Sequence, residues 1–116
     1  MRVPVRIPIG GKQVTVEYPL VVQGDKDEED LYGDTSSNGR RIRISLTECK
    51  SDADLLATVF HEMLHSALAI SGVTAVLNPT SEEAVACSLE SMLSPLLCLN
   101  ENAGIKWREI EMPWEK

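Results

Sequence analysis

Hydrophobic and polar residues alternate near the start of the chain, and this pattern predicts β-structure. Apolar side chains fall at every second position from Val3 to Ile9 and again from Val14 to Tyr18, which is the period of a strand with one buried face. Gly10-Gly11 separates the two runs and is typical of a tight turn. We therefore predict a β-hairpin, in which Pro4 and Pro8 favour edge positions because proline cannot donate to a sheet.

The same alternation returns at Arg41–Leu46, where the apolar residues lie on one face of a predicted strand. Between the hairpin and this strand, Leu20–Val22 could resume the β-structure. Gly24–Asp30 is acidic and is predicted to be an inert solvated loop, since its carboxylates lack the spacing of a calcium loop. Asp34–Gly39 is rich in turn-forming residues.

The apolar period changes to that of a helix after Ser51. Ser51-Asp52-Ala53-Asp54 resembles a capping box with Asp in place of Glu, so either Thr47 or Ser51 can start the helix. Ser71-Gly72 ends the apolar run. The apolar residues at helical spacing are Leu55, Leu56, Val59, Phe60, Met63, Leu64, Ala67 and Leu68.

A second helix is predicted to open at Pro79-Thr80-Ser81, with Glu82 and Glu83 in its first turn, where the helix dipole favours acidic residues. Pro95 should kink or weaken its last turn. Near the C-terminus, Ile105–Trp107 could form a short strand or docking segment. The predicted apolar stripe of this helix consists of Val85, Leu89, Met92, Leu93, Leu96 and Leu97.

The order of these elements predicts an α+β fold in a single domain of residues 1–116: a small N-terminal antiparallel or mixed sheet, followed by two helices. The chain is 43% hydrophobic and 25% charged, which is an ordinary globular balance. Its net charge of -7 makes nucleic acid an unfavourable partner. No apolar stretch is long enough to span a membrane, and the first six residues lack the core of a secretory signal. We expect a cytoplasmic protein with reduced thiols. Cys87 could be an alternative metal ligand, although a small buried residue is the favoured interpretation.

His61-Glu62-Met63-Leu64-His65 lies well inside the first predicted helix and contains both histidines of the chain. Residues four apart share one face of a helix, so the two imidazoles can bind one metal ion. Glu62 is then placed beside a metal-bound water as a general base. This HExxH pattern is typical of hydrolytic zinc sites.

A catalytic zinc usually takes three protein ligands, and no third histidine exists, so the third ligand must be a carboxylate or a thiolate. Glu82 and Glu83 are the candidates. On a helical wheel Glu82 falls near the centre of the apolar stripe and Glu83 off its edge, so periodicity favours Glu82. The one that does not bind metal would be a first-turn dipole residue.

From residue 31 to residue 100 the chain resembles the small, phage-type minimal zinc metallopeptidases of the gluzincin group, and is distantly similar to the peptidase domain of the ImmA/IrrE family. The resemblance implies a zincin-like core, with the histidine motif on the first helix and a metal-binding glutamate on the second. That glutamate falls on Glu83, with Glu82 as the alternative. The matching segments are Leu31–Gly33, Arg41–Leu46, Leu55–Ala67 and Glu82–Leu89, followed by Leu93, Leu97 and Asn100.

The resemblance implies a hydrolase: a zinc metallopeptidase that cleaves a protein or peptide substrate, in the host cytoplasm if the protein is phage-encoded. His61, His65 and Glu83 would hold Zn²⁺, and Glu62 would be the general base. Arg41–Leu46, if it is an edge strand, could pair with the substrate. The larger members' oxyanion-stabilising histidine is missing. Tyr32 could replace it, although a packed aromatic is the favoured interpretation.

Two other interpretations are retained. The chain could be a zinc-binding interaction or regulatory module of a phage or prophage, with little or no turnover. It could also be a structural α+β protein in which the motif occurs by accident.

Overall fold

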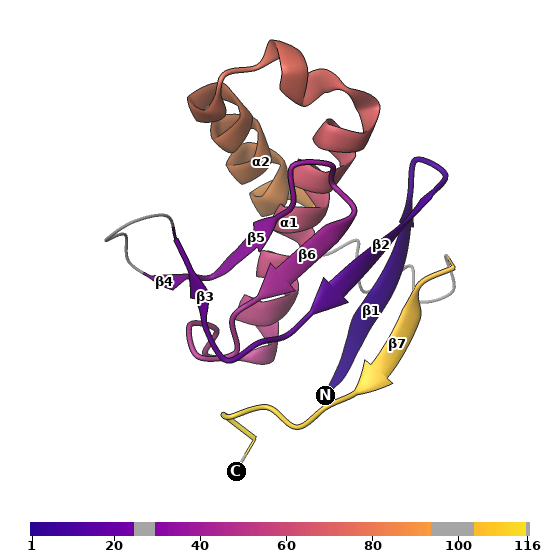
Figure 1. Ribbon diagram of the computed structural model, residues 1–116. Coiled ribbons are helices and arrows are strands. Elements are labelled where there is room, and N and C mark those ends of the chain that lie inside the picture. The colour runs from indigo at the N-terminus through magenta and orange to yellow at the C-terminus, as the bar shows by residue number, and fades with distance from the viewer. Residues whose placement is uncertain (25–29, 94–103, 116) are drawn as a thin grey trace.

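The α+β class is confirmed by a computed structural model, which describes residues 1–24, 30–93 and 104–115. A mixed five-stranded sheet carries two helices on one face (Figure 1). The sheet has the order β5-β6-β2-β1-β7, and a separate ribbon pairs β3 with β4. The strands are β1 (Arg2–Ile9), β2 (Lys12–Glu17), β3 (Val22–Gln23), β4 (Asp30–Leu31), β5 (Gly33–Thr35), β6 (Arg41–Ile44) and β7 (Lys106–Glu109). The helices are α1 (Asp52–Ser71), the 3-10 turn η1 (Val73–Val76) and α2 (Pro79–Leu93).

The predicted hairpin is formed by β1 and β2, which pair in antiparallel register with Ile7 opposite Val14. The prediction that its prolines favour an edge needs correction, because β1 lies between β2 and β7. Locally, however, each proline has one partner strand. Pro4 lies in the stretch paired with β7, and Pro8 in the stretch paired with β2. The missing proline N–H is thus tolerated.

The strand predicted at Arg41–Leu46 is β6, but it is internal, so the condition under which it could pair with a substrate is not met. β6 runs parallel to β2 and antiparallel to β5, which forms the edge of the sheet. β5 was expected to be part of a turn. It is short and polar, and the side chain of Asp34 forms an ion pair with Arg43 across the two strands. Such cross-strand pairs stabilise a strand that has no apolar alternation of its own.

The C-terminal segment confirms a strand near Ile105–Trp107, because β7 pairs with β1 at the opposite edge of the sheet. It brings the two ends of the described chain together: the Met1 ammonium contacts Glu109 Oε1 at 2.7 Å and Glu115 Oε1 at 3.0 Å. Trp114 donates from Nε1 to Asp52 Oδ1 at 2.7 Å, which anchors the tail to the start of α1. The sequence order suggested a purely N-terminal sheet, and β7 shows that this expectation is wrong.

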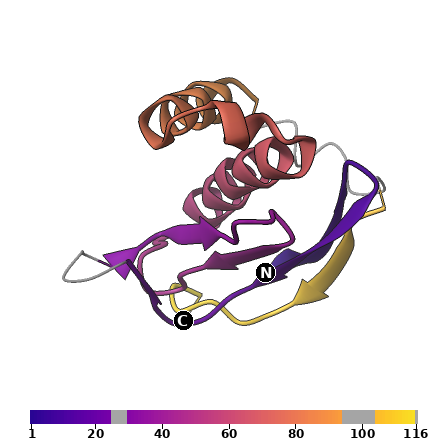
Figure 2. The same ribbon diagram turned by 45° about the horizontal axis from the view of Figure 1, so that its top comes forward.

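Helix α1 begins and ends where the sequence predicts. Ser51 caps it by accepting a hydrogen bond from the Asp54 N–H at 3.1 Å, and Gly72 ends it in the left-handed conformation. Figure 2 shows α1 lying between the sheet and α2, so that it is covered on both sides. The core formed between α1 and the sheet consists of Val3, Ile7, Val14, Val16, Ile42, Ile44, Cys49, Leu55, Val59 and Met112.

Helix α2 also begins as predicted, since Asn78 Oδ1 accepts a hydrogen bond from the Ser81 N–H at 2.8 Å. Its predicted apolar stripe does not form a buried face at the described positions. Val85 and Leu89 are each 36% exposed, whereas the smaller Ala86 is fully buried. The helical wheel is therefore a poor guide to which side of α2 faces α1.

Several predictions fall outside the described residues. These are the kink at Pro95, the part of the acidic loop at residues 25–29, Leu96, Leu97, Cys98 and Asn100. The side chains of Met92 and Leu93 are likewise not described. Among the described residues, no helix combines the length and apolarity that a bilayer span requires.

Gly39 sets the approach of the β5–β6 turn to α1. Its φ is +74°, and an added Cβ would lie 2.8 Å from the Ser66 carbonyl oxygen. The buried Ser66 hydroxyl donates to the Gly39 carbonyl at 2.5 Å. The turn that follows the edge strand is thus docked directly on the helix that carries the histidines.

Gly39→Ala should lower the free energy of unfolding by roughly 2–4 kcal/mol, because backbone strain and a steric clash add. Gly11→Ala is the matched control. Its φ is +76° but nothing lies within 4 Å of the added Cβ, so only the strain of about 1 kcal/mol should appear. Urea denaturation of both variants measures the difference. Equal losses would show that the contact with Ser66 does not matter.

Candidate metal centre

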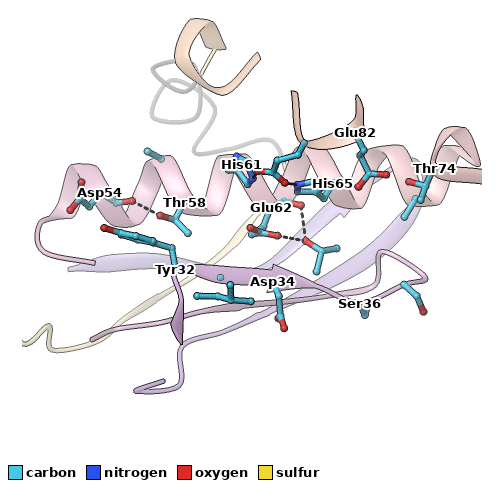
Figure 3. A pocket seen from close by; sticks show the side chains of 17 residues that line it. Tyr32, Asp34, Ser36, Asp54, Thr58, His61, Glu62, His65, Thr74 and Glu82 are labelled. Atoms are coloured by element: carbon cyan, nitrogen blue, oxygen red, sulfur yellow. Dashed lines mark hydrogen bonds and ion pairs between the residues drawn. The ribbon is translucent and has the colours of Figure 1, made fainter. Parts of the chain in front are cut away.

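His61 and His65 lie one turn apart on the side of α1 that faces α2 (Figure 3). Their ring centroids are 4.9 Å apart and the ring planes are inclined at 65°. Each side chain is 15% exposed, so the rings are mostly covered but remain accessible from one direction. The spacing predicted from the sequence therefore brings the two imidazoles together.

Glu83 reaches both histidines from the first turn of α2. Its Oε1 lies 2.9 Å from His61 Nε2, and its Oε2 lies 3.0 Å from His65 Nε2. The ligand atoms of these three residues all lie within 4.8 Å of one another. The position that the family resemblance singles out is therefore the one that faces both Nε2 atoms.

Glu82 contacts the other nitrogen of His65. Its Oε2 lies 2.5 Å from Nδ1. Burial alone would raise the pKa of Glu82, but hydrogen bonds with Thr74 and His65 outweigh burial and lower this pKa. An ionised carboxylate can only accept, so the Nδ1–H of His65 is the donor. Helical periodicity favoured Glu82 as the residue that faces the histidines' metal-binding side, but here it lies on the opposite side of the ring.

His65 therefore has a carboxylate at each ring nitrogen. Burial of the ring disfavours its charged form, but the hydrogen bond with Glu82 and the charges of Glu62 and Glu83 outweigh burial and raise the pKa of His65. Glu83 Oε2 faces Nε2 across a distance of 3.0 Å. A divalent cation could bind between these two atoms in place of a proton.

Glu62 points away from α2 and toward the sheet, where it is 7% exposed (Figure 3). The Thr35 hydroxyl lies 2.7 Å from Glu62 Oε1 and 3.1 Å from the Glu62 backbone oxygen. Burial raises the pKa of Glu62, and the Thr35 hydrogen bond and the neighbouring histidines oppose this only in part. A carboxylate with a raised pKa, held by one hydrogen bond, is suited to accept and return a proton.

A cavity of about 780 Å³ opens between α1, α2 and the edge strand β5. His61, Glu62, His65, Glu82 and Glu83 all line it. The cavity extends along β5, and Figure 3 shows Tyr32, Asp54 and Thr58 at the end opposite to Glu82. The described lining carries five carboxyl groups and no lysine or arginine, which favours a negative electrostatic potential in the cavity. The acidic residues are Asp34, Asp54, Glu62, Glu82 and Glu83.

Two predictions about residues near the cavity are wrong. Tyr32 is not a packed aromatic: it is 53% exposed and lines the cavity. Cys87 is exposed rather than buried, and its Sγ lies 3.5 Å from Glu83 Oε1. Whether a single side chain is buried depends on the segments that pack around it, and the periodicity of a few neighbouring residues does not determine this.

Sequence reasoning did not single out Thr35. It lies 27 residues before Glu62 in a segment with the composition of a turn, so nothing in its local pattern links it to the motif. The hydrogen bond exists because β5 packs beside α1.

No protein-family model, curated protein or solved structure matches the chain significantly. The interpretation of the site therefore depends on its own geometry and chemistry.

The donor set fits a zinc ion. Two neutral imidazoles and one carboxylate are a usual protein ligand set for catalytic zinc. Zinc bonds of about 2.0–2.2 Å hold tetrahedral ligands roughly 3.4 Å apart. The two nitrogen–oxygen contacts of 2.9 and 3.0 Å would need to widen by a few tenths of an ångström. The most widely separated ligand atoms, at up to 4.8 Å, would need to approach each other by roughly 1.4 Å. Glu83, with a side chain 55% exposed, has room to move.

Proposed function

We propose that this protein is a zinc-dependent metallopeptidase with a gluzincin-type, zincin-like site. One observation carries the proposal: His61, His65 and Glu83 bring their ligand atoms within 4.8 Å of one another. They do so in a cavity that is also lined by the buried Glu62. A hydrolytic site needs both a three-residue metal site and an acid–base group beside it.

Zinc bound by His61, His65 and Glu83 would polarise the scissile carbonyl and acidify the attacking water. Glu62 would take a proton from the attacking water and return it to the leaving amine, which is general base and then general acid catalysis by one group. Burial keeps the pKa of Glu62 raised, which brings it closer to the operating pH. The Thr35 hydroxyl holds one carboxylate oxygen and leaves the other available for the water.

The edge strand β5 supports a peptide as the substrate. β5 lies at the end of the sheet, is paired on one side with β6, and lines the cavity through all of its residues. An extended peptide can add to such an edge through main-chain hydrogen bonds. The negative potential of the cavity favours neutral or basic peptides over acidic ones.

A second function, a zinc-binding interaction module without turnover, is favoured by one observation. The described lining contains no lysine or arginine, and its two histidines face Glu83, so no cationic side chain is available to stabilise an oxyanion. A peptidase would therefore need another donor for the oxyanion, and the hydroxyl of Tyr32, which is exposed and lines the cavity, is a candidate.

One experiment separates these functions. Protein purified without a histidine tag is assayed for zinc, and for cleavage of a mixed peptide library by mass spectrometry. The proposal expects one zinc per chain, and cleavage that a chelator stops and added zinc restores. One zinc without any cleavage would favour the interaction module. Less than about a tenth of a zinc per chain, unchanged by added zinc, would show that the protein has no zinc site and that the motif occurs by accident.

A further inference from the structure

The first turn of α2 presents two adjacent glutamates to the same histidine, from opposite sides of its ring. Glu83 Oε2 lies 3.0 Å from His65 Nε2, whereas Glu82 Oε2 lies 2.5 Å from His65 Nδ1. We propose that Glu82 is a positioning residue, which holds His65 so that its Nε2 lone pair faces the metal. The inference rests on the metal site of the proposed function, and it assigns the pair of glutamates two different roles.

The hydrogen bond with Glu82 selects the tautomer of His65. A histidine binds a metal through a nitrogen that carries no proton, so a neutral ring must keep its proton on the other nitrogen. Glu82 accepts a hydrogen bond from Nδ1–H, which keeps the proton there and leaves the lone pair on Nε2. The same hydrogen bond fixes the rotation of the ring. Without it, the ring has two tautomers and more than one orientation to choose from.

The helix geometry keeps the two glutamates from exchanging roles. Neighbouring residues on a helix point about 100° apart. Glu82 is thereby directed toward Thr74 at one end of the cavity, where its side chain is only 16% exposed, while the Glu83 side chain is 55% exposed. For Glu82 to bind the metal, it would have to leave Nδ1 and move around the ring to Nε2.

Glu82 has a second neighbour besides His65. Thr74, in the η1 turn that joins the two helices, lies beside Glu82 and helps to lower the pKa of its carboxyl group. Figure 3 shows Glu82 between Thr74 and His65 at one end of the cavity. The contact series Thr74–Glu82–His65 thus links the helix connection to the metal site. A glutamate that only complemented the helix dipole would need neither partner.

The test measures zinc affinity, by competition with a chromophoric chelator, in Glu82→Gln, Glu82→Ala and Glu83→Ala. Loss of a group that orients a metal-binding histidine typically costs 10- to 100-fold in affinity. We expect a loss of about 10- to 100-fold for Glu82→Ala and a smaller one for Glu82→Gln, since a glutamine oxygen still accepts from Nδ1–H. Glu111→Gln, at an exposed position in the tail, is the matched control and should bind zinc like the wild type.

The visible spectrum of bound Co²⁺ separates a positioning residue from a ligand, because it reports the number and type of ligand atoms. Glu82→Ala should keep the wild-type bands at saturating Co²⁺, and Glu83→Ala should change them. Wild-type zinc affinity in Glu82→Ala would overturn the inference. So would a changed spectrum in Glu82→Ala together with an unchanged one in Glu83→Ala, since Glu82 would then be the ligand.

These readouts require bound metal but no catalysis, so they fail separately from the proposed function. If no peptide is cleaved but the affinities and spectra follow the expected pattern, the peptidase proposal fails and the role of Glu82 stands. If peptides are cleaved and Glu82→Ala binds zinc normally, the peptidase proposal stands and the role of Glu82 fails. Thermal unfolding of the metal-free variants checks folding, and the isosteric Glu82→Gln keeps the test decisive if Glu82→Ala does not fold.

Discussion

Glu62→Gln should lower the rate of peptide cleavage by roughly 10²- to 10⁴-fold, while the protein still binds one zinc per chain. Glutamine has the shape of glutamate, and its oxygen can still accept the Thr35 hydrogen bond, so the 7% exposed side chain should remain in place. It cannot take a proton from water. The substitution therefore removes the acid–base step and leaves the three proposed ligands intact.

The measurement is the cleavage rate of the best library peptide, with the zinc content determined on the same sample. Glu111→Gln makes the same chemical change at an exposed position outside the cavity and should cleave at the wild-type rate. If Glu62→Gln cleaves as fast as the wild type, Glu62 is not the general base. A rate loss that is accompanied by loss of zinc would indicate a disturbed site instead.

His61→Ala should reduce the zinc content from one per chain to less than about a tenth, because two ligands on this small domain hold zinc weakly. It should also abolish the stabilisation that zinc gives. At free zinc near 100 times the Kd, binding stabilises the folded state by about 2.7 kcal/mol, which raises the Tm by about 10 °C for a domain of this size.

The matched comparison is between the metal-free proteins. His61 lies in the cavity lining and not in the hydrophobic core, so the wild type and His61→Ala should unfold at similar temperatures in the presence of a chelator. Only the wild type should then gain stability when zinc is added. A variant that gains as much as the wild type would exclude His61 as a ligand, and with it the proposed site.

Local sequence patterns predicted the hairpin and the helix that carries the histidine motif. Alternation from Val3 to Ile9 and the following turn specify the hairpin, because strand periodicity and a Gly-Gly turn act over a few residues. Ser51 and Gly72 mark the ends of α1 through hydrogen bonds and backbone geometry close to each end. The four-residue spacing of the histidines then places both rings on one face without any tertiary contact.

Contacts between distant segments were not predictable in this way. β5 exists as an edge strand because it pairs with β6, and it was interpreted as a turn because its composition is polar. Val85 and Leu89 have the spacing of a buried stripe yet remain 36% exposed, because which side of α2 faces α1 depends on the connection between the helices.

The sequence by itself determined that two imidazoles and a carboxylate share one helix, because helical geometry depends only on spacing along the chain. It left open which of Glu82 and Glu83 faces the Nε2 atoms and which group holds the buried Glu62. Tertiary structure decided both. The packing of α2 on α1 directs Glu83 to the two Nε2 atoms and Glu82 to Nδ1, and the docking of β5 beside α1 brings Thr35 to Glu62. These contacts join segments whose relative positions depend on the whole core.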